Sequence, residues 1–143
     1  MVVKKRRKRP NKGTKAREKW ELRNLKKKCS RAWSIRVRNL ADNKCVLCES
    51  EALLHSHHLE DSRLCTSLRY DTRNGVCVCA KHHKYCNEAA HKSFSTIFRY
   101  MVNNRLDDIH YLESHRNDKV EWTTELLLKK IGELQNGKDA KSR

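Results

Sequence analysis

Two pairs of metal-ligand residues constrain the fold of this chain most strongly. Cys45 and Cys48 are separated by two residues, and so are Cys79 and His82. A two-residue spacer lets both side chains bind one ion, and three thiolates with one imidazole form a closed tetrahedral set suited to zinc. Only 37% of the 143 residues are hydrophobic and 35% are charged, so the apolar core must be small. We therefore expect one small domain stabilised by a structural zinc ion.

Neighbouring cysteines leave this ligand assignment open. Cys77 lies on the same side of a strand as Cys79 and can replace it as a ligand. Cys86 lies four residues after His82 and can replace that histidine. A further interpretation is that all these thiols are buried without a metal ion.

The cysteine count and the N-terminus both indicate a reducing compartment. Seven is an odd number of cysteines, no apolar run approaches a membrane span, and residues 1–10 lack the apolar region of a signal peptide. We therefore expect a cytoplasmic protein that is not secreted and does not bind membranes, with cysteines that are metal ligands or free thiols. Cys29 and Cys65 are interpreted as packing residues or incidental thiols.

Positive charge is concentrated at the N-terminus. Residues 1–40 hold 17 Lys and Arg against two Glu, whereas the other 103 residues hold 16 Lys and Arg against 15 Asp and Glu. This asymmetry favours nucleic acid as the partner, with a nuclear-localisation signal or ribosome association as the alternatives. Residues 1–13 are predicted to be a disordered basic arm that orders on a phosphate backbone.

Residues 14–40 contain neither Gly nor Pro and are predicted to form one basic amphipathic helix. Its apolar stripe recurs at three- and four-residue steps and comprises Leu22, Leu25, Cys29, Trp33, Val37 and Leu40. The opposite face is basic, and its candidate nucleic-acid-binding residues are Arg23, Lys27, Arg31 and Arg38. The alternative is a solvated face with no ligand.

The remaining residues predict an α+β fold. A strand is expected within residues 52–60, and a second strand at 75–79 follows the turn signal Asn74-Gly75. A helix is expected over residues 80–92, which completes a core spanning 41–92. Amphipathic helices are then expected within 93–135, the last one capped by Asn117 or Asp118, before a flexible tail at 136–143.

A second group of ligand-type residues lies among the zinc ligands. His57 and His58 point to opposite faces of a regular strand, so one can bind a metal ion while the other addresses water or nucleic acid. His83 and Asn87 are spaced i, i+4 on the expected helix and can hold one cation together. An ion held by His57, His83 and Asn87 keeps open positions for water and phosphate.

These segments resemble the HNH endonuclease family, which has a ββα-metal fold. The resemblance lies in the order Cys-x-x-Cys, HSHHLE and RYDTRNGVCVCAKHH, and it covers roughly residues 20–100. The chain is most similar to small phage-type HNH proteins. Those proteins carry a basic helix before the Cys pair, an Arg-aromatic-Asp-x-x-Asn-Gly approach to the second strand and a Cys-x-x-Cys-His start to the helix.

The resemblance implies a role for each residue of the second group. It makes His57 and His83 ligands of a catalytic ion and His58 the general base. Asn74 becomes the residue that braces the loop and so orients the base. Asn87 takes a position at which many members have a further histidine.

The chain departs from the family pattern at two positions. His82 stands where the family usually has the fourth zinc cysteine, and imidazole also binds zinc. Asn87 in place of histidine favours Mg²⁺ or Mn²⁺ over a second zinc, because it offers an oxygen donor. Arg69 and Arg73 lie in the loop between the strands and are expected to contact phosphates, unless they form local ion pairs.

The function expected from these features is metal-dependent hydrolysis of DNA phosphodiester bonds, by nicking or by cutting both strands. The partner is double-stranded DNA, and either a dimer or a phage or host DNA-processing protein remains open as a further partner. If the protein is phage-encoded, as the resemblance implies, its compartment is the cytoplasm of the bacterial host. The alternative function is a non-catalytic, zinc-stabilised nucleic-acid-binding module, which needs only the first ligand set.

Overall fold

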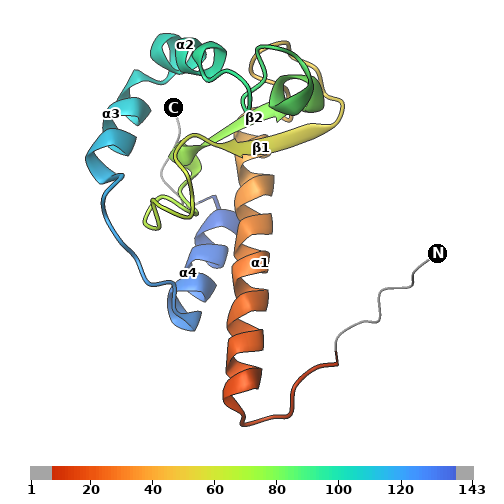
Figure 1. The fold of residues 1–143 in the computed structure, drawn as a ribbon, viewed down its shortest axis with the longest axis vertical. Coiled ribbons are helices and arrows are strands. Elements are labelled where there is room, and N and C mark those ends of the chain that lie inside the picture. The colour runs from red at the N-terminus through yellow and green to blue at the C-terminus, as the bar shows by residue number, and fades with distance from the viewer. Residues whose placement is uncertain (1–7, 138–143) are drawn as a thin grey trace, which may run out of the picture.

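The computed structural model describes residues 8–137, and it combines helices with a small two-stranded sheet, as the predicted α+β class requires. The two strands pair in an antiparallel sheet across the C-terminal end of the longest helix (Figure 1). In chain order the elements are α1 (Lys15–Leu40), β1 (Leu54–His58), the 3₁₀ turn η1 (Thr72–Asn74), β2 (Gly75–Cys79), the π-helical turn η2 (Lys81–Tyr85), α2 (Ser95–Asn104), α3 (Leu106–His115) and α4 (Thr124–Gln135).

Helix α1 confirms the prediction for residues 14–40. The Thr14 side chain caps it by accepting a hydrogen bond from the Arg17 backbone N–H at 3.2 Å. The predicted apolar stripe faces α4, which runs alongside α1 (Figure 1). The buried members of this cluster are Cys29, Ala32, Trp33, Val37, Tyr70, Leu127 and Leu134.

The sheet confirms both predicted strands. Its register pairs His57 with Val76 and His58 with Gly75. Because side chains alternate along a strand, His57 and His58 lie on opposite faces of β1. Every residue of β2 is buried, so the second strand forms the centre of the small core.

The helix predicted over residues 80–92 is wrong in its length. The chain forms only the single turn η2, and Cys86 then adopts an extended backbone with φ −80° and ψ 167°. The following segment turns back, so that the backbone N–H of Ala90 donates to the His82 carbonyl at 2.8 Å. Hydrogen bonds of this turn thus replace those of a continued helix.

The predicted cap of the last helix is also wrong. Helix α4 begins at Thr124, and the Thr123 side chain caps it rather than Asn117 or Asp118. Residues before it are held extended against the loop between the strands. The Val120 N–H donates to Thr66 Oγ1 at 2.9 Å, and Trp122 Nε1 donates to the Thr66 carbonyl at 2.8 Å.

The part of the basic arm that the structure describes contacts α1. Arg17 Nη1 donates to the Pro10 carbonyl at 3.2 Å, and the guanidinium of Arg9 lies 5.1 Å from the centroid of the Trp20 ring. Residues 8–13 therefore have defined contacts that the prediction of a disordered arm did not include. Residues 1–7 of that arm and 138–143 of the predicted tail lie outside the described residues.

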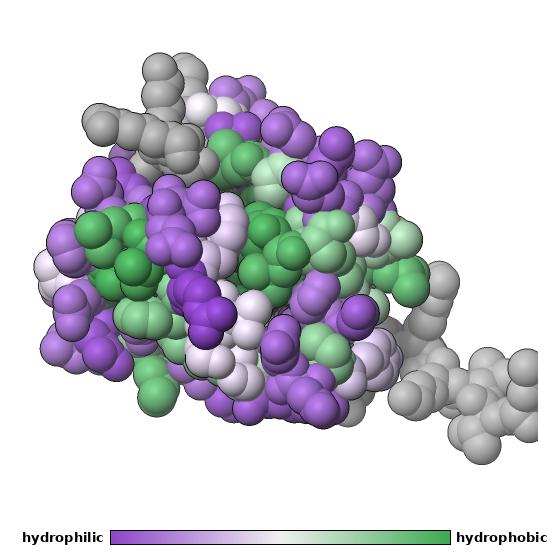
Figure 2. All heavy atoms as spheres, turned by 90° about the horizontal axis from the view of Figure 1, so that it is seen from above, coloured by the Kyte–Doolittle hydropathy of each residue, from purple (hydrophilic) through white to green (hydrophobic). Residues whose placement is uncertain are grey.

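The face of the molecule drawn in Figure 2 is mostly hydrophilic. Figure 2 shows the face at the top of Figure 1, where apolar side chains gather in patches between hydrophilic ones. Within residues 8–137, no helix is both long enough and apolar enough to cross a membrane.

Candidate metal centres

The four residues predicted to bind zinc converge in the structure. Cys45, Cys48, Cys79 and His82 place their ligand atoms within 4.8 Å of one another. Cys48 Sγ lies 3.8 Å from Cys79 Sγ, and His82 Nδ1 lies 3.6 Å from Cys45 Sγ and 3.3 Å from Cys79 Sγ. Tetrahedral zinc with ordinary bond lengths separates two sulfurs by about 3.8 Å and a sulfur from a nitrogen by about 3.6 Å. This Cys3His cluster can therefore hold a metal ion such as zinc.

The backbone around Cys45 explains how the cluster forms. The Cys45 N–H donates to the Ser50 carbonyl at 2.9 Å, and Glu49 takes a left-handed conformation with φ 59° to close the turn. The Val46 N–H then donates to the carbonyl of Cys77 at 3.0 Å, which fastens the turn to β2. The two halves of the cluster are thus joined through the sheet.

The structure decides between the alternative sulfur ligands. Cys77 is buried, and its thiol is outside the group of ligand atoms that converge. Burial raises the pKa of the Cys77 thiol to about 11. Burial also raises the pKa of Cys79, but hydrogen bonds from His82, Cys48 and Cys45 outweigh it and bring the pKa to about 7. Cys79 is thus the sulfur prepared to be a thiolate ligand.

Cys86 and the two cysteines interpreted as packing residues stay outside both metal-ligand groups of the described chain. Cys29 and Cys65 are buried, as predicted. Burial raises the pKa of Cys29 to about 12, so its thiol stays protonated and acts as a small apolar side chain.

A second cluster consists of three histidines: His57, His83 and His91. Their ring centroids lie 4.6 to 5.4 Å apart, and the Nε2 atoms of His83 and His91 are separated by 3.1 Å. Two imidazole nitrogens on one ion with ordinary bond lengths are separated by about 3.0 to 3.4 Å. His55 stacks on His83 at 4.9 Å and adds an exposed fourth ring beside the cluster.

The second group of ligand-type residues proposed from the sequence did not include His91. The turn after η2 brings its backbone N–H to the carbonyl of His83 at 3.4 Å, so His91 lies beside His83. A continuous helix would have placed these residues about 12 Å apart along its axis. No local sequence pattern signals this reversal, and therefore sequence reasoning missed His91.

The structure removes the reason for which Asn87 was chosen as a metal ligand. Helix η2 ends at Tyr85, so His83 and Asn87 do not share a helical face, and Asn87 is exposed. Its proposed contact with a cation stays a prediction from the family resemblance.

The protonation state of the histidine cluster suits a metal ion. Burial, with the nearby His91 and His83, lowers the pKa of His57 to about 4. Burial, with His91 and His55, also lowers the pKa of His83 to about 4. Both rings are therefore neutral near pH 7, the form that binds metals. His83 Nδ1 is buried without a hydrogen-bond partner, and an ion bound at Nε2 would leave Nδ1 as the protonated nitrogen.

His58 occupies the opposite face of β1 and has different contacts. Its ring stacks on Trp33 of α1, and its Nε2 lies 3.0 Å from the carbonyl oxygen of Arg69. A carbonyl can only accept, so Nε2 carries the proton and Nδ1 is the basic atom of the neutral ring. Burial lowers the pKa of His58, although the Arg69 carbonyl partly opposes this shift.

Asn74 is completely buried and holds the loop between the strands. Its Oδ1 accepts from the Glu60 N–H at 2.7 Å, while Nδ2 donates to the carbonyls of Glu60 and Leu68, both at 3.1 Å. These bonds fix both ends of the loop segment 60–68. The carbonyl of Arg69, the hydrogen-bond partner of His58, follows immediately.

The loop arginines have local partners. Arg73 lies over the Tyr111 ring at 4.0 Å and its Nε is 4.0 Å from a carboxylate oxygen of Asp108. Arg63 forms a 2.8 Å ion pair with Asp61. Arg69 lies over the Tyr70 ring at 5.7 Å. The side chain of Arg73 therefore makes more local contacts than the side chain of Arg69.

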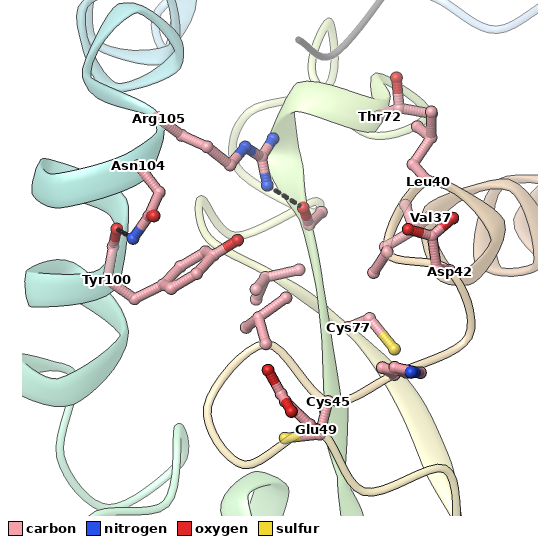
Figure 3. A pocket seen from close by; sticks show the side chains of 15 residues that line it. Val37, Leu40, Asp42, Cys45, Glu49, Thr72, Cys77, Tyr100, Asn104 and Arg105 are labelled. Atoms are coloured by element: carbon pink, nitrogen blue, oxygen red, sulfur yellow. Dashed lines mark hydrogen bonds between the residues drawn. The ribbon is translucent and has the colours of Figure 1, made fainter.

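One cavity joins the two faces of β1. It has a volume of about 560 Å³, and its lining includes His57, His58, His83, His91 and Phe94. A separate cavity between α1, β2 and α2 holds no histidine (Figure 3). There Arg105 Nη1 donates to the Gly75 carbonyl at 2.8 Å and braces the start of β2.

The basic face of α1 begins beside this sheet. Ser34 Oγ donates to Ser56 Oγ at 3.1 Å, and Ser56 lines the histidine cavity. Arg23, Lys27 and Arg31 are exposed at four-residue steps, and at 100° per residue they share the side of the helix on which Ser34 lies. Arg38 is half-buried near the end of the same face.

Comparison of the chain with models of known protein families gave no match, and comparisons with curated proteins and with solved structures gave none either. The functional interpretation therefore rests on the residues and the geometry described above.

Proposed function

We propose that this protein is a metal-dependent DNA endonuclease of the HNH type. One observation carries the proposal: a three-histidine cluster and a histidine with a fixed tautomer line the same cavity. The cluster lies on one face of β1, and His58 lies on the other. A module that only bound nucleic acid would have no use for this arrangement.

His58 is the general base in this proposal. Its Nδ1 takes a proton from water, the water oxygen bonds to phosphorus, and the bond from phosphorus to the 3′ oxygen breaks. That oxygen then takes a proton from solvent. The products are a 5′ phosphate and a 3′ hydroxyl, as the family resemblance implies. Asn74 holds the loop that presents the Arg69 carbonyl, and this carbonyl fixes the tautomer of His58. A divalent ion in the cluster would supply positive charge for the phosphate and the leaving oxygen.

The ligand set revises the expected identity of the catalytic ion. Asn87 suggested an oxygen donor and hence Mg²⁺ or Mn²⁺. With His91 as the third ligand, all three donors of the cluster are imidazole nitrogens, which favour transition ions over Mg²⁺. We therefore propose a transition ion for this cluster and a structural Zn²⁺ for the Cys3His cluster. Mn²⁺ serves as the test ion because it can be distinguished from that zinc.

DNA capture is assigned to α1 and the basic arm. The exposed face with Arg23, Lys27 and Arg31 starts at the serine contact beside the cavity. These three residues span about 12 Å of helix, so they can follow several phosphates of one strand. Arg69 and Arg38 remain candidates for further phosphate contacts.

A plasmid assay tests the proposed function. Supercoiled DNA is incubated with the protein and Mn²⁺, alongside His58→Ala and the exposed-residue control His110→Ala. We expect nicking by the wild type and by His110→Ala, and a loss of about 100- to 10,000-fold for His58→Ala. DNA binding without nicking by any of the three proteins would favour the non-catalytic module.

A further inference from the structure

We infer that Trp33 of α1 is a positioning residue for His58, acting as a rigid platform for the imidazole ring. This inference rests on the proposed function, because the ring matters only if His58 is the base. The two rings lie face to face, with centroids 3.8 Å apart and planes 6° from parallel. Trp33 is only 3% exposed, so it has little freedom to move away.

Trp33 is itself fixed at its far edge. Its Nε1–H donates to the Asp71 carbonyl at 2.8 Å. The Asp71 carboxylate in turn accepts from the Tyr111 hydroxyl at 3.0 Å and from the Arg73 N–H at 2.8 Å. The indole plane is therefore tied to the loop that also carries Arg69, the hydrogen-bond partner of His58.

The two contacts of His58 are complementary. Stacking on Trp33 sets the plane of the imidazole, and the Arg69 carbonyl sets its rotation within that plane. Together they remove the freedom of χ1 and χ2 that an isolated strand-end histidine would keep. The basic atom Nδ1 thereby has one direction, which is the pre-organisation that proton transfer requires.

Gly75 makes room for this stack. It is the residue paired with His58 in the sheet, and a Cβ there would lie 2.9 Å from Trp33 Cζ2 and 2.4 Å from Val37 Cγ2. Its φ of −124° is available to any residue, so close approach rather than backbone conformation explains the glycine. The sequence thus places a glycine where the indole passes over the strand towards His58.

The test compares Trp33→Leu and Trp33→Phe with the matched control Trp122→Leu. Trp122 belongs to the same core region and donates to a loop carbonyl at 2.8 Å, but the structure shows no ring contact between it and His58. We expect Trp33→Leu to lower kcat for nicking by about 10- to 100-fold with KM unchanged. Trp33→Phe, which keeps a ring face, should restore most of kcat, and Trp122→Leu should keep it.

A second measurement needs no activity and no folded variant of Trp33. In the NMR spectrum of the zinc-loaded wild type at neutral pH, the His58 ring protons, assigned by their loss in His58→Ala, should be shifted upfield by the indole face. Unshifted signals would overturn the inference. So would equal kcat losses in Trp33→Leu and Trp122→Leu. If the wild type does not nick, the proposed function fails and this role fails with it, whereas nicking with wild-type kcat in Trp33→Leu removes this role alone.

Discussion

The adjacent residues His82 and His83 belong to two different clusters. His82 joins three cysteines and completes a set of four donors, which satisfies a tetrahedral ion and leaves no position for substrate. His83 joins two other histidines beside a cavity, and three donors leave positions for water and phosphate. In the proposed function, one short turn, η2, connects a structural centre to a chemical one.

Replacing His83 and His82 in turn gives the largest contrast. We expect His83→Ala to lower nicking by about 1000-fold while zinc content and folding stay unchanged, because the open cluster loses a ligand. His82→Ala should instead release zinc and destabilise the chain. Plasmid nicking, zinc analysis and thermal unfolding are measured on both variants. Loss of zinc from His83→Ala would contradict the separation of the two clusters.

Replacing Cys45 tests the structural role directly. Cys45→Ser removes a buried ligand, and we expect it to lower the free energy of unfolding by about 4 kcal/mol or more. Cys77→Ser is the control, since Cys77 is equally buried but binds no ion in this account. Chemical denaturation with zinc present measures both. If Cys45→Ser lowered the free energy of unfolding less than Cys77→Ser does, the assignment of Cys45 as a zinc ligand would be wrong.

His91 and Asn87 are compared to define the third ligand of the open cluster. His91→Ala should weaken Mn²⁺ binding by about 100-fold, whereas Asn87→Ala should change it little, because only His91 lies beside His83. Isothermal titration of the zinc-loaded proteins with Mn²⁺ measures the affinities. If Asn87→Ala weakened Mn²⁺ binding more than His91→Ala does, Asn87 would be the third ligand, as the family resemblance implies.

The basic face of α1 should affect binding rather than chemistry. Replacing Arg23, Lys27 and Arg31 together by Gln should reduce the slope of log affinity against log salt by about 3, since each phosphate contact contributes about 0.9. The rate of nicking at saturating DNA should stay unchanged. Fluorescence anisotropy with labelled duplex DNA at several salt concentrations measures the slope. An unchanged slope would show that this face of α1 is solvated and does not contact DNA.

Sequence reasoning succeeded where the signal is local. The apolar repeat of α1, the turn before β2 and the paired two-residue spacers of the Cys3His cluster each lie within a few residues, and each predicted its element or ligand set. Sequence reasoning failed where contacts between distant segments determine the local structure. The reversal after Cys86 brings His91 to His83, and contacts with Thr66 delay the start of α4 until Thr124.

The stack of Trp33 on His58 shows the same limit. The periodicity of α1 correctly predicted that Trp33 would be buried, but it gave no partner for the ring. The partner lies 25 residues away in the chain, and the contact depends on the crossing of α1 and β1 and on the space left by Gly75. Such a contact requires the assembled fold, because no single segment encodes it.

Selective removal of metal tests the central claim most directly. The protein is treated with a mild chelator, then zinc content, folding and plasmid nicking are measured before and after Mn²⁺ is added. We predict that one zinc ion per chain and the fold survive, that nicking is lost, and that Mn²⁺ restores it. Nicking that disappears only when the zinc and the fold are lost would contradict two separate centres, and so would nicking that never needed the added ion.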